Sequence, residues 1–169
     1  GMPELIAALA PMGGRSVSTM IWKDQVSVVA PDHKADDWFS QVVGQEVVLA
    51  YMPDAVVREV DLSYAPAGGR TGFADGFPFL LAGEASLAEL NSRMARPLPM
   101  NRFRPNLVVS GSAPFAEDNW QSIRIGGIPM QVVKPCARCV VTTTDPATGT
   151  VWASESATSP VPGGMSMIR

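Results

Sequence analysis

Cysteine and histidine are scarce in this sequence. Among its 169 residues there are two cysteines, Cys136 and Cys139, and one histidine, His33. A disulfide between two cysteines so close in sequence would enclose too small a loop to restrain the unfolded chain appreciably. A structural zinc site normally needs four cysteine or histidine ligands, and this sequence offers fewer. The scarcity therefore argues against a disulfide scaffold and against a structural zinc centre.

Strong charge and long apolar runs are also missing. The net charge is -3, and the basic residues form no stripe that would attract nucleic acid. No apolar run approaches the roughly 18 residues of a membrane-spanning helix. Residues 1–14 lack the basic segment of a secretory signal, and Gly1-Met2 resembles a tag remnant before the native start. We therefore expect a cytoplasmic protein that binds neither nucleic acid nor membranes.

What the sequence does contain is the composition of a folded domain, with 46% hydrophobic and 17% charged residues. Period-two and β-branched segments predict strands, and the first of them reads as a strand or a hairpin. These segments are residues 16–30, 46–51, 106–111, 120–126, 128–133 and 138–144. Helices are predicted at 36–43 and 84–94, with a long irregular loop at 65–78. The expected class is mainly β with a few helices (α+β), arranged as a barrel or sandwich.

Local signals refine this outline. Ser86, followed three residues later by Glu89, predicts a capping box at the start of the second helix. Gly126-Gly127 predicts a tight hairpin between two strands. Residues 117–120, Glu-Asp-Asn-Trp, could pass for a catalytic acid pair but fit a turn with a packed tryptophan better. The segment from 154 onward shows no periodicity, and we expect it to be mostly unpacked.

The two cysteines form a C-x-x-C segment whose role the residues alone leave open. A thioredoxin-like dithiol begins a helix, but here the next residues are β-branched and favour a strand. In the simplest alternative one or both cysteines are small buried hydrophobes. Lys134 and Arg138 flank the pair, and positive charge favours the thiolate, the form that binds soft metals. Two interpretations therefore remain: one cysteine binds a metal while the other is a bystander, or the cysteines only pack in the protein.

Four segments in a fixed order carry a resemblance to a known family. They are FADGFPFLLAGEASLAELNSRM (73–94), MNRFRPNLVVSG (100–111), PFAEDNWQSIRIGG (114–127) and VKPCARCVVTTTDPATG (133–149). Together they resemble the MOSC domain, found at the C-terminus of molybdenum cofactor sulfurases and in amidoxime-reducing molybdenum proteins and their bacterial relatives. The resemblance is strong over about 70–149 and weaker over 18–64. It implies a partial N-terminal MOSC-type β region at 1–64, the MOSC core at 65–153 and an irregular tail at 154–169.

The resemblance also implies a MOSC-type β-barrel that binds the molybdenum cofactor (molybdopterin). In the reductase branch the second cysteine of C-x-R-C is the protein ligand of the metal, which corresponds to Cys139 as the catalytic and metal-binding residue. Cys136 would then be a bystander that packs in the protein. The cofactor-binding residues implied in the same way are Arg104, Asn106, Ala137, Arg138, Asp75 and Gly76. No pyridoxal phosphate site is identified in this chain.

The chain departs from full-length relatives at both ends. It lacks the Lys-Ser pair and the Asp-Arg-x-Trp-like segment that precede the resemblance in those relatives, and the KEPL-like segment that follows it. It therefore looks truncated, and a missing barrel edge would leave strand groups that a second copy could pair, so we expect a homodimer. No ferredoxin-like cysteine cluster follows, so electrons would come from an external electron-transfer protein.

These features give one leading hypothesis and two alternatives. The leading hypothesis is a molybdenum-dependent oxidoreductase that reduces small N-oxygenated or S-oxygenated compounds. The first alternative is a non-catalytic cofactor-binding or sulfur-carrier module that holds a persulfide on a cysteine. The second is a truncated remnant without cofactor. The sequence does not separate the reductase from the carrier, because both need the same thiolate.

Overall fold

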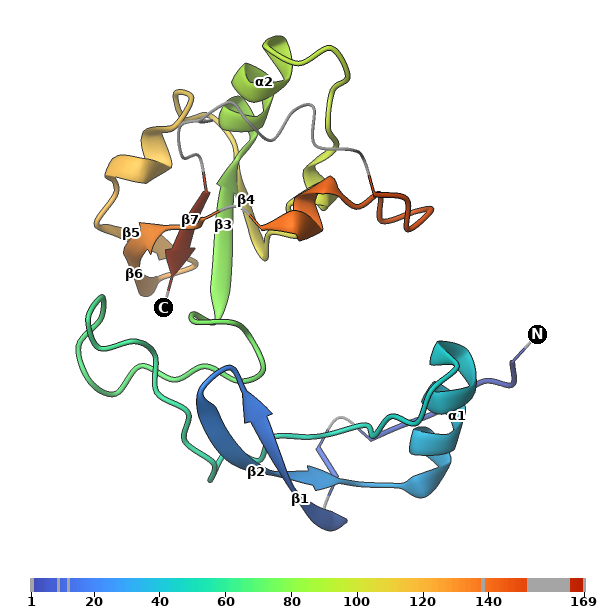
Figure 1. Cartoon of the computed structure of the whole chain (residues 1–169). Helices are drawn as coiled ribbons and strands as arrows, with labels where there is room; N and C mark the ends of the chain where they lie inside the picture. The colour runs from blue at the N-terminus through green and yellow to red at the C-terminus, as the bar shows by residue number, and fades with distance from the viewer. Residues whose placement is uncertain (1, 9, 12, 138, 152–164, 169) are drawn as a thin grey trace. The chain divides into compact units, whose positions relative to one another are not determined.

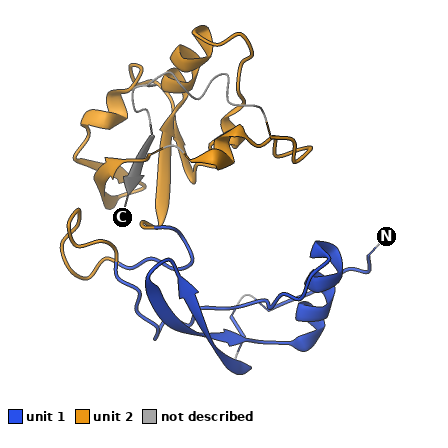
Figure 2. Ribbon diagram, viewed as in Figure 1, with its two compact units in different colours: residues 1–59, 70–75 blue, residues 60–69, 76–169 orange. Residues whose placement is uncertain are grey.

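The computed structural model describes residues 2–8, 10–11, 13–137, 139–151 and 165–168, the last of these by their backbone. The chain divides into two compact units, residues 1–59 with 70–75 and residues 60–69 with 76–169 (Figure 2). In chain order the elements, with η for a 3-10 helix, are β1 (Arg15–Ile21), β2 (Asp24–Ala30), α1 (His33–Val43), β3 (Phe79–Gly83), α2 (Glu84–Ser92), η1 (Met100–Arg102), β4 (Leu107–Val109), η2 (Ala116–Asn119), β5 (Ser122–Ile125), β6 (Ile128–Pro135), η3 (Val140–Thr143) and β7 (Met165–Ile168) (Figure 1).

The first unit contains an antiparallel hairpin and one helix. β1 pairs with β2 in a register that ends at Ile21 opposite Asp24, which confirms the hairpin reading of residues 16–30. β2 buries every second side chain, as a strand with one solvent face does. α1 follows with Asp32 as its N-cap and Gly44 at φ 75° as its left-handed C-cap. The predicted helix is confirmed, although it begins at His33 rather than at residue 36.

The strand expected at residues 46–51 is wrong, because only Tyr51 forms a bridge, to Val29. The amides of the segment are used by side chains of α1 instead of by a neighbouring strand. The amide of Val47 donates to Ser40 Oγ at 3.0 Å, and that of Leu49 donates to Asp36 Oδ1 at 2.8 Å. Polar side chains of the helix thus satisfy the backbone that the sequence pattern assigned to a sheet.

The second unit is built on a five-stranded sheet with the order β4-β3-β7-β6-β5. β3 and β4 are parallel and the remaining pairs are antiparallel. β5 and β6 form the predicted hairpin, in which Gly126 (φ 54°) and Gly127 (φ 86°) have the left-handed conformations of a tight turn. The core surrounds β3, where Leu81 and Ala82 are fully buried. Partly buried side chains pack on Ala82 and Phe103: Leu80, Leu87, Leu90, Leu98, Met100 and Cys136.

The α+β class is confirmed, since strands predominate and α1 and α2 are the helices of more than one turn in the described residues. Over that same part of the chain neither sheet closes on itself, because the larger one ends at β4 and β5. The barrel implied by the resemblance therefore stays a prediction. None of the described helices combines the length and the hydropathy needed to cross a lipid bilayer.

The strand predicted at residues 138–144 is wrong. Residues Val140–Thr143 form η3, and residue 138 lies outside the described residues. The hydroxyls of Thr142 and Thr143 donate to the carbonyls of Cys139 and Val140 at 3.0 and 2.6 Å, so they stabilise a turn in place of a strand. The place in the sheet between β3 and β6 belongs to β7.

β7 also corrects the prediction of an unpacked tail. Met165–Ile168 pairs with both β3 and β6 and is an interior strand of the sheet. Its alternating Met and Ser carried no recognisable strand signal, because pairing on both edges, rather than local propensity, creates the strand. Residues 154–164, which belong to the same prediction, lie outside the described residues.

The capping box predicted at Ser86 is wrong as well, although the helix itself is present. α2 has Gly83 as its N-cap and no side-chain capping hydrogen bond. Ser86 is buried, and its hydroxyl donates to Glu117 Oε1 at 2.6 Å while accepting from the amide of Phe115 at 2.8 Å. A tertiary partner has therefore replaced the local one.

Candidate functional site

The two cysteines of the C-x-x-C segment have different surroundings. Cys136 is partly buried and packs against the Ala82–Phe103 cluster, which confirms the packing role expected for it. Cys139 is exposed and stands immediately before η3, where its carbonyl accepts from the amide and the hydroxyl of Thr142 at 3.3 and 3.0 Å. Of the two cysteines, Cys139 is therefore the more accessible to a ligand.

A buried arginine joins the segment after Cys139 to the MNRFRPN segment. Arg102, the last residue of η1, has a side chain that is 1% exposed. Its Nη1 lies 3.5 Å from the carbonyl oxygen of Thr142, and its Nη2 lies 3.6 Å from Asp145 Oδ2. Two of the four segments that carry the family resemblance are thus in direct contact. Sequence reasoning missed Arg102, because nothing in the pattern distinguishes it from the nearby Arg104.

Arg104 has the opposite orientation. It is exposed and has a left-handed backbone conformation with φ 51°, which is costly for a residue with a Cβ. Its amide donates to the carbonyl of Asn101 at 3.2 Å, closing the turn after η1. Within the described residues no hydrogen bond or ion pair engages its guanidinium, which is therefore available to an anion.

Asn106 is fixed by the sheet. Its Oδ1 accepts from the amide of Leu80 at 2.8 Å, and its own amide donates to the carbonyl of Leu80 at 2.9 Å. This reciprocal pair joins the start of β4 to β3 and leaves the side-chain amide nitrogen as the group that faces other partners. Ala137 is exposed beside Cys136, and Arg138 lies outside the described residues.

The predicted cofactor loop crosses the boundary between the two units. Asp75 belongs to the first unit and Gly76 to the second. Asp75 is exposed, and its Oδ1 accepts from Nε1 of Trp22 at 3.2 Å. The backbone of this loop is bound by Arg58, a buried residue that sequence reasoning missed because arginine is usually exposed.

The ammonium group of Lys134 lies over two aromatic rings. Its Nζ lies 4.2 Å from the ring centroid of Tyr64 and 5.7 Å from that of Phe77. An ammonium over aromatic faces is a favourable cation–π arrangement. Lys134 thereby holds residues 60–69 against β6, a structural role that the sequence did not indicate.

Glu117 is the most deeply buried charged residue near β3, with 0% exposure. Its Oε1 accepts from the amide of Gly83 at 3.0 Å and from the hydroxyl of Ser86 at 2.6 Å. The expected turn is confirmed, because η2 occupies Ala116–Asn119. The carboxylate serves the junction between β3 and α2, and these contacts are structural rather than catalytic.

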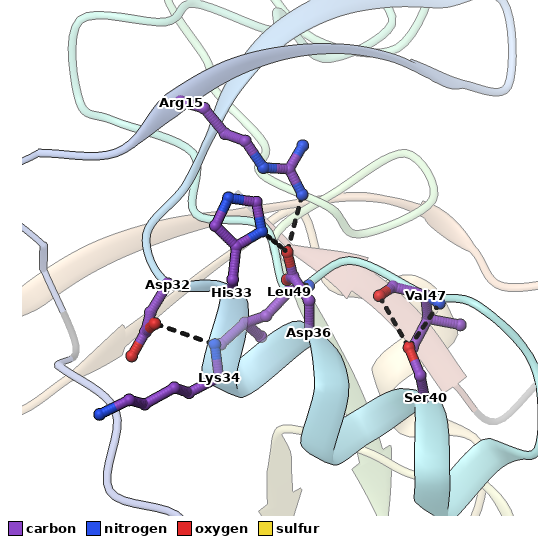
Figure 3. A network of polar contacts seen from close by, with 8 residues as sticks. All are labelled: Arg15, Asp32, His33, Lys34, Asp36, Ser40, Val47 and Leu49. Atoms are coloured by element: carbon purple, nitrogen blue, oxygen red, sulfur yellow. Dashed lines mark hydrogen bonds and ion pairs between the residues drawn. The ribbon is translucent and has the colours of Figure 1, made fainter.

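A second polar network lies in the first unit, around Asp36 of α1 (Figure 3). Burial alone would raise the pKa of Asp36. The hydrogen bond from Arg15 at 2.7 Å and that from the amide of Leu49 outweigh burial, so the pKa of this carboxyl lies below its ordinary value of 3.8. His33 is exposed, and its Nδ1 lies 3.8 Å from Asp36 Oδ2.

Metal-ligating side chains do not gather anywhere in the described ranges. No group of three or more histidine, cysteine, aspartate or glutamate residues there could hold a metal ion.

The chain is similar to proteins of one known family. The profile of the MOSC domain matches residues 68–167. The chain is 36% identical over 115 residues to mitochondrial amidoxime reducing component 2 of Bos taurus, which covers 68% of the chain and 33% of that protein. It is 47% identical over 77 residues to mitochondrial amidoxime-reducing component 1 of Homo sapiens, covering 46% of the chain and 23% of that protein. With the Danio rerio component 1 the identity is 43% over 84 residues, 50% of the chain and 26% of that protein. The chain thus spans a third or less of the length of these relatives, and it belongs to the MOSC domain family.

Proposed function

We propose that this MOSC protein binds the molybdenum cofactor and reduces small N-oxygenated or S-oxygenated compounds with electrons from an external electron-transfer protein. The observation that carries the proposal is that Cys139 is exposed, whereas Cys136 is partly buried against the Ala82–Phe103 cluster. The names of the amidoxime-reducing relatives support the reductase assignment.

The described residues fit such a cofactor chemically. Thiolate is a soft ligand suited to molybdenum, and Cys139 is accessible to it. A cofactor phosphate needs a planar set of donors, and Arg104 has an exposed guanidinium. The amide nitrogen of Asn106 is held in place by the contacts of Oδ1 with β3 and can donate to a pterin edge.

Each residue then has a proposed role. The thiolate of Cys139 would coordinate the metal, and the buried Arg102 holds the turn that follows Cys139. Arg104 and Arg138 bind the cofactor phosphate, and Asn106 and Ala137 contact the pterin. The loop with Asp75 and Gly76 also contributes cofactor contacts. When bound, the cofactor supplies the oxygen-atom and electron transfer.

We also propose that the sheet of the second unit is completed by further strands. The open sheet edges at β4 and β5 could be covered by further strands that close a MOSC-type barrel, or by a second copy in a homodimer. A cytoplasmic location also stays a prediction for this chain, while the names of the relatives place those proteins in mitochondria.

The second candidate function is the non-catalytic carrier, which would hold the cofactor or a persulfide on the same cysteine without turnover. The exposure of Cys139 favours it equally, because a persulfide must be reached by its acceptor. Cyanide-releasable sulfur in place of a redox activity would identify this alternative.

The test is the molybdenum content per chain, measured by inductively coupled plasma mass spectrometry on protein from a host that makes the cofactor. Cys139→Ser is compared with Cys136→Ala and with Arg96→Gln, an exposed arginine outside the proposed site. We expect molybdenum near one per chain in the wild type and in both controls, and its loss in Cys139→Ser.

Turnover decides between the two functions. Benzamidoxime reduction with reduced methyl viologen as donor, abolished by Cys139→Ser, supports the reductase. Molybdenum or persulfide without turnover supports the carrier. A wild-type chain with neither molybdenum nor persulfide contradicts both functions.

A further inference from the structure

Arg58 makes more hydrogen bonds than any other side chain recorded for the first unit. It is 5% exposed, and its guanidinium donates to three backbone carbonyls and one carboxylate. Nη1 donates to the carbonyls of Gly72 and Ala74 at 2.9 and 2.5 Å, and Nη2 donates to that of Asp75 at 2.9 Å. Nε donates to Asp24 Oδ2 at 2.8 Å, which compensates the buried charge.

This arrangement determines the conformation of residues 72–75. Three carbonyls that converge on one planar fork of donors cannot rotate independently, and only arginine offers donors in that fixed geometry. The amide of Thr71 also donates to the carbonyl of Arg58 at 3.0 Å. Both the backbone and the side chain of Arg58 therefore bind the loop. The loop is thus preformed by the protein itself.

The same guanidinium also holds the turn of the hairpin. Asp24 is the first residue of β2, and Trp22 lies two residues before it in the turn. Trp22 has φ 56°, a strained conformation for a bulky residue, and it is 72% exposed. Its Nε1 donates to Asp75 Oδ1 at 3.2 Å. The strained turn therefore presents an indole donor to the carboxylate of the loop that Arg58 holds.

We propose that Arg58 and Trp22 are positioning residues that hold the Asp75 loop and its carboxylate in the conformation that contacts the cofactor. This inference rests on the proposed function, because it takes the cofactor as the ligand of Asp75. Preforming the loop spares cofactor binding the cost of ordering it, so loss of either residue weakens retention of the cofactor.

The first arm of the test is hydrogen–deuterium exchange of the full chain without cofactor. The variants are Arg58→Lys and, as a matched control on the same loop, Arg70→Gln, which loses one hydrogen bond to the carbonyl of Asp54. In Arg58→Lys we expect the amides of residues 71–76 to exchange at least about tenfold faster, with β2 and α1 changed much less. Arg70→Gln should leave residues 71–76 within about twofold of the wild type.

The second arm measures how fast molybdenum is lost from each protein on dialysis. We expect loss about tenfold faster in Arg58→Lys and about threefold faster in Trp22→Phe, which keeps the exposed ring and removes only the donor. Trp22→Phe is then repeated in an Asp75→Ala background. If Trp22 acts through Asp75, it has no further effect there.

The outcomes distinguish the positioning roles of Arg58 and Trp22 from the proposed function. A uniform rise in exchange over the first unit, or none in the loop, overturns the role of Arg58. An equal effect of Trp22→Phe with and without Asp75 overturns the role of Trp22. A wild-type chain without molybdenum overturns the proposed function and the cofactor as the ligand of the loop, while exchange still decides whether Arg58 holds residues 71–76.

Discussion

Arg58 in the first unit and Glu117 in the second are both buried charged side chains that bind polar groups of neighbouring segments, and their charges have opposite sign. In the first unit Arg58 binds the carbonyls of a loop, and in the second Glu117 binds the amide of Gly83 and the hydroxyl of Ser86. The sign follows from the groups left unpaired: converging carbonyls need donors, and inward-facing amide and hydroxyl groups need an acceptor.

The two cases also differ in where the bound groups lie. Residues 72–75 are exposed, so their carbonyls can bond to water once they are released from Arg58. Gly83 and Ser86 are buried, and without Glu117 they have no access to solvent. The free-energy cost of losing the interaction therefore depends on how buried the bound groups are, rather than on how buried the charged side chain is.

The largest effect should come from Glu117→Ala. It leaves a buried amide and a buried hydroxyl without their acceptor and opens a cavity, so we expect a loss of about 3–4 kcal/mol in the free energy of unfolding. Urea denaturation followed by circular dichroism measures it. A loss below about 1 kcal/mol would contradict the comparison, because it would mean that Gly83 and Ser86 find other partners.

Gly83→Ala tests the same junction by steric conflict. A Cβ at residue 83 would lie 2.7 Å from Glu117 Oε1 and 2.8 Å from Ser86 Oγ. The backbone of Gly83 has an ordinary extended conformation, so the close approach, and not the dihedral angle, demands glycine. We expect a loss of about 2–3 kcal/mol, and a smaller loss in a Glu117→Ala background. Equal losses in the two backgrounds would exclude a direct conflict with Glu117.

Asp36 is an intermediate case, because its partner Arg15 is partly exposed. Its folded pKa is lowered, so its contribution to stability is complete above the ordinary value of 3.8 and is lost as the pH falls through the folded pKa. Asp36→Asn should cost about 1–2 kcal/mol at pH 7 and progressively less below pH 4. Urea denaturation at pH 7 and pH 3 gives both values. A difference that does not change with pH would show that the charge of Asp36 does not matter.

Arg58→Lys should have the smallest effect on global stability. We expect about 1 kcal/mol, since lysine retains one charged contact and the released carbonyls bond to water. The same urea denaturation measures it, and Arg70→Lys is the control with no expected change. A loss as large as that of Glu117→Ala would show that the burial of the bound groups does not determine the cost of losing the interaction.

Elements that local pattern determines could be predicted from the sequence. The hairpins around residues 22–23 and 126–127 and the helices α1 and α2 depend on nearby residues, and all are present. Residues 46–51 and 138–144 also have strong strand propensity, yet the described residues of these two segments form no strand. Strand formation needs a partner, and in these segments side chains of α1 and the hydroxyls of Thr142 and Thr143 supply it instead.

The candidate site divides in the same way. The different surroundings of Cys136 and Cys139 agree with the roles implied by the family resemblance, while the ligand role of Cys139 stays a prediction. The buried arginines Arg58 and Arg102 could not be found, because arginine is usually exposed and only the folded chain determines which ones are enclosed.

The interior position of β7 has a consequence for how the protein is made. During synthesis β3 emerges from the ribosome some eighty residues before β7, and β6 emerges about thirty residues before β7. Both strands must therefore wait for β7, the strand that lies between them in the sheet. Until that neighbour emerges, the facing edges of β3 and β6 are unpaired and open to strands of other nascent chains. Translation speed and chaperone supply should therefore affect the yield of the second unit more than that of the first, whose hairpin and helix are complete within the first 43 residues.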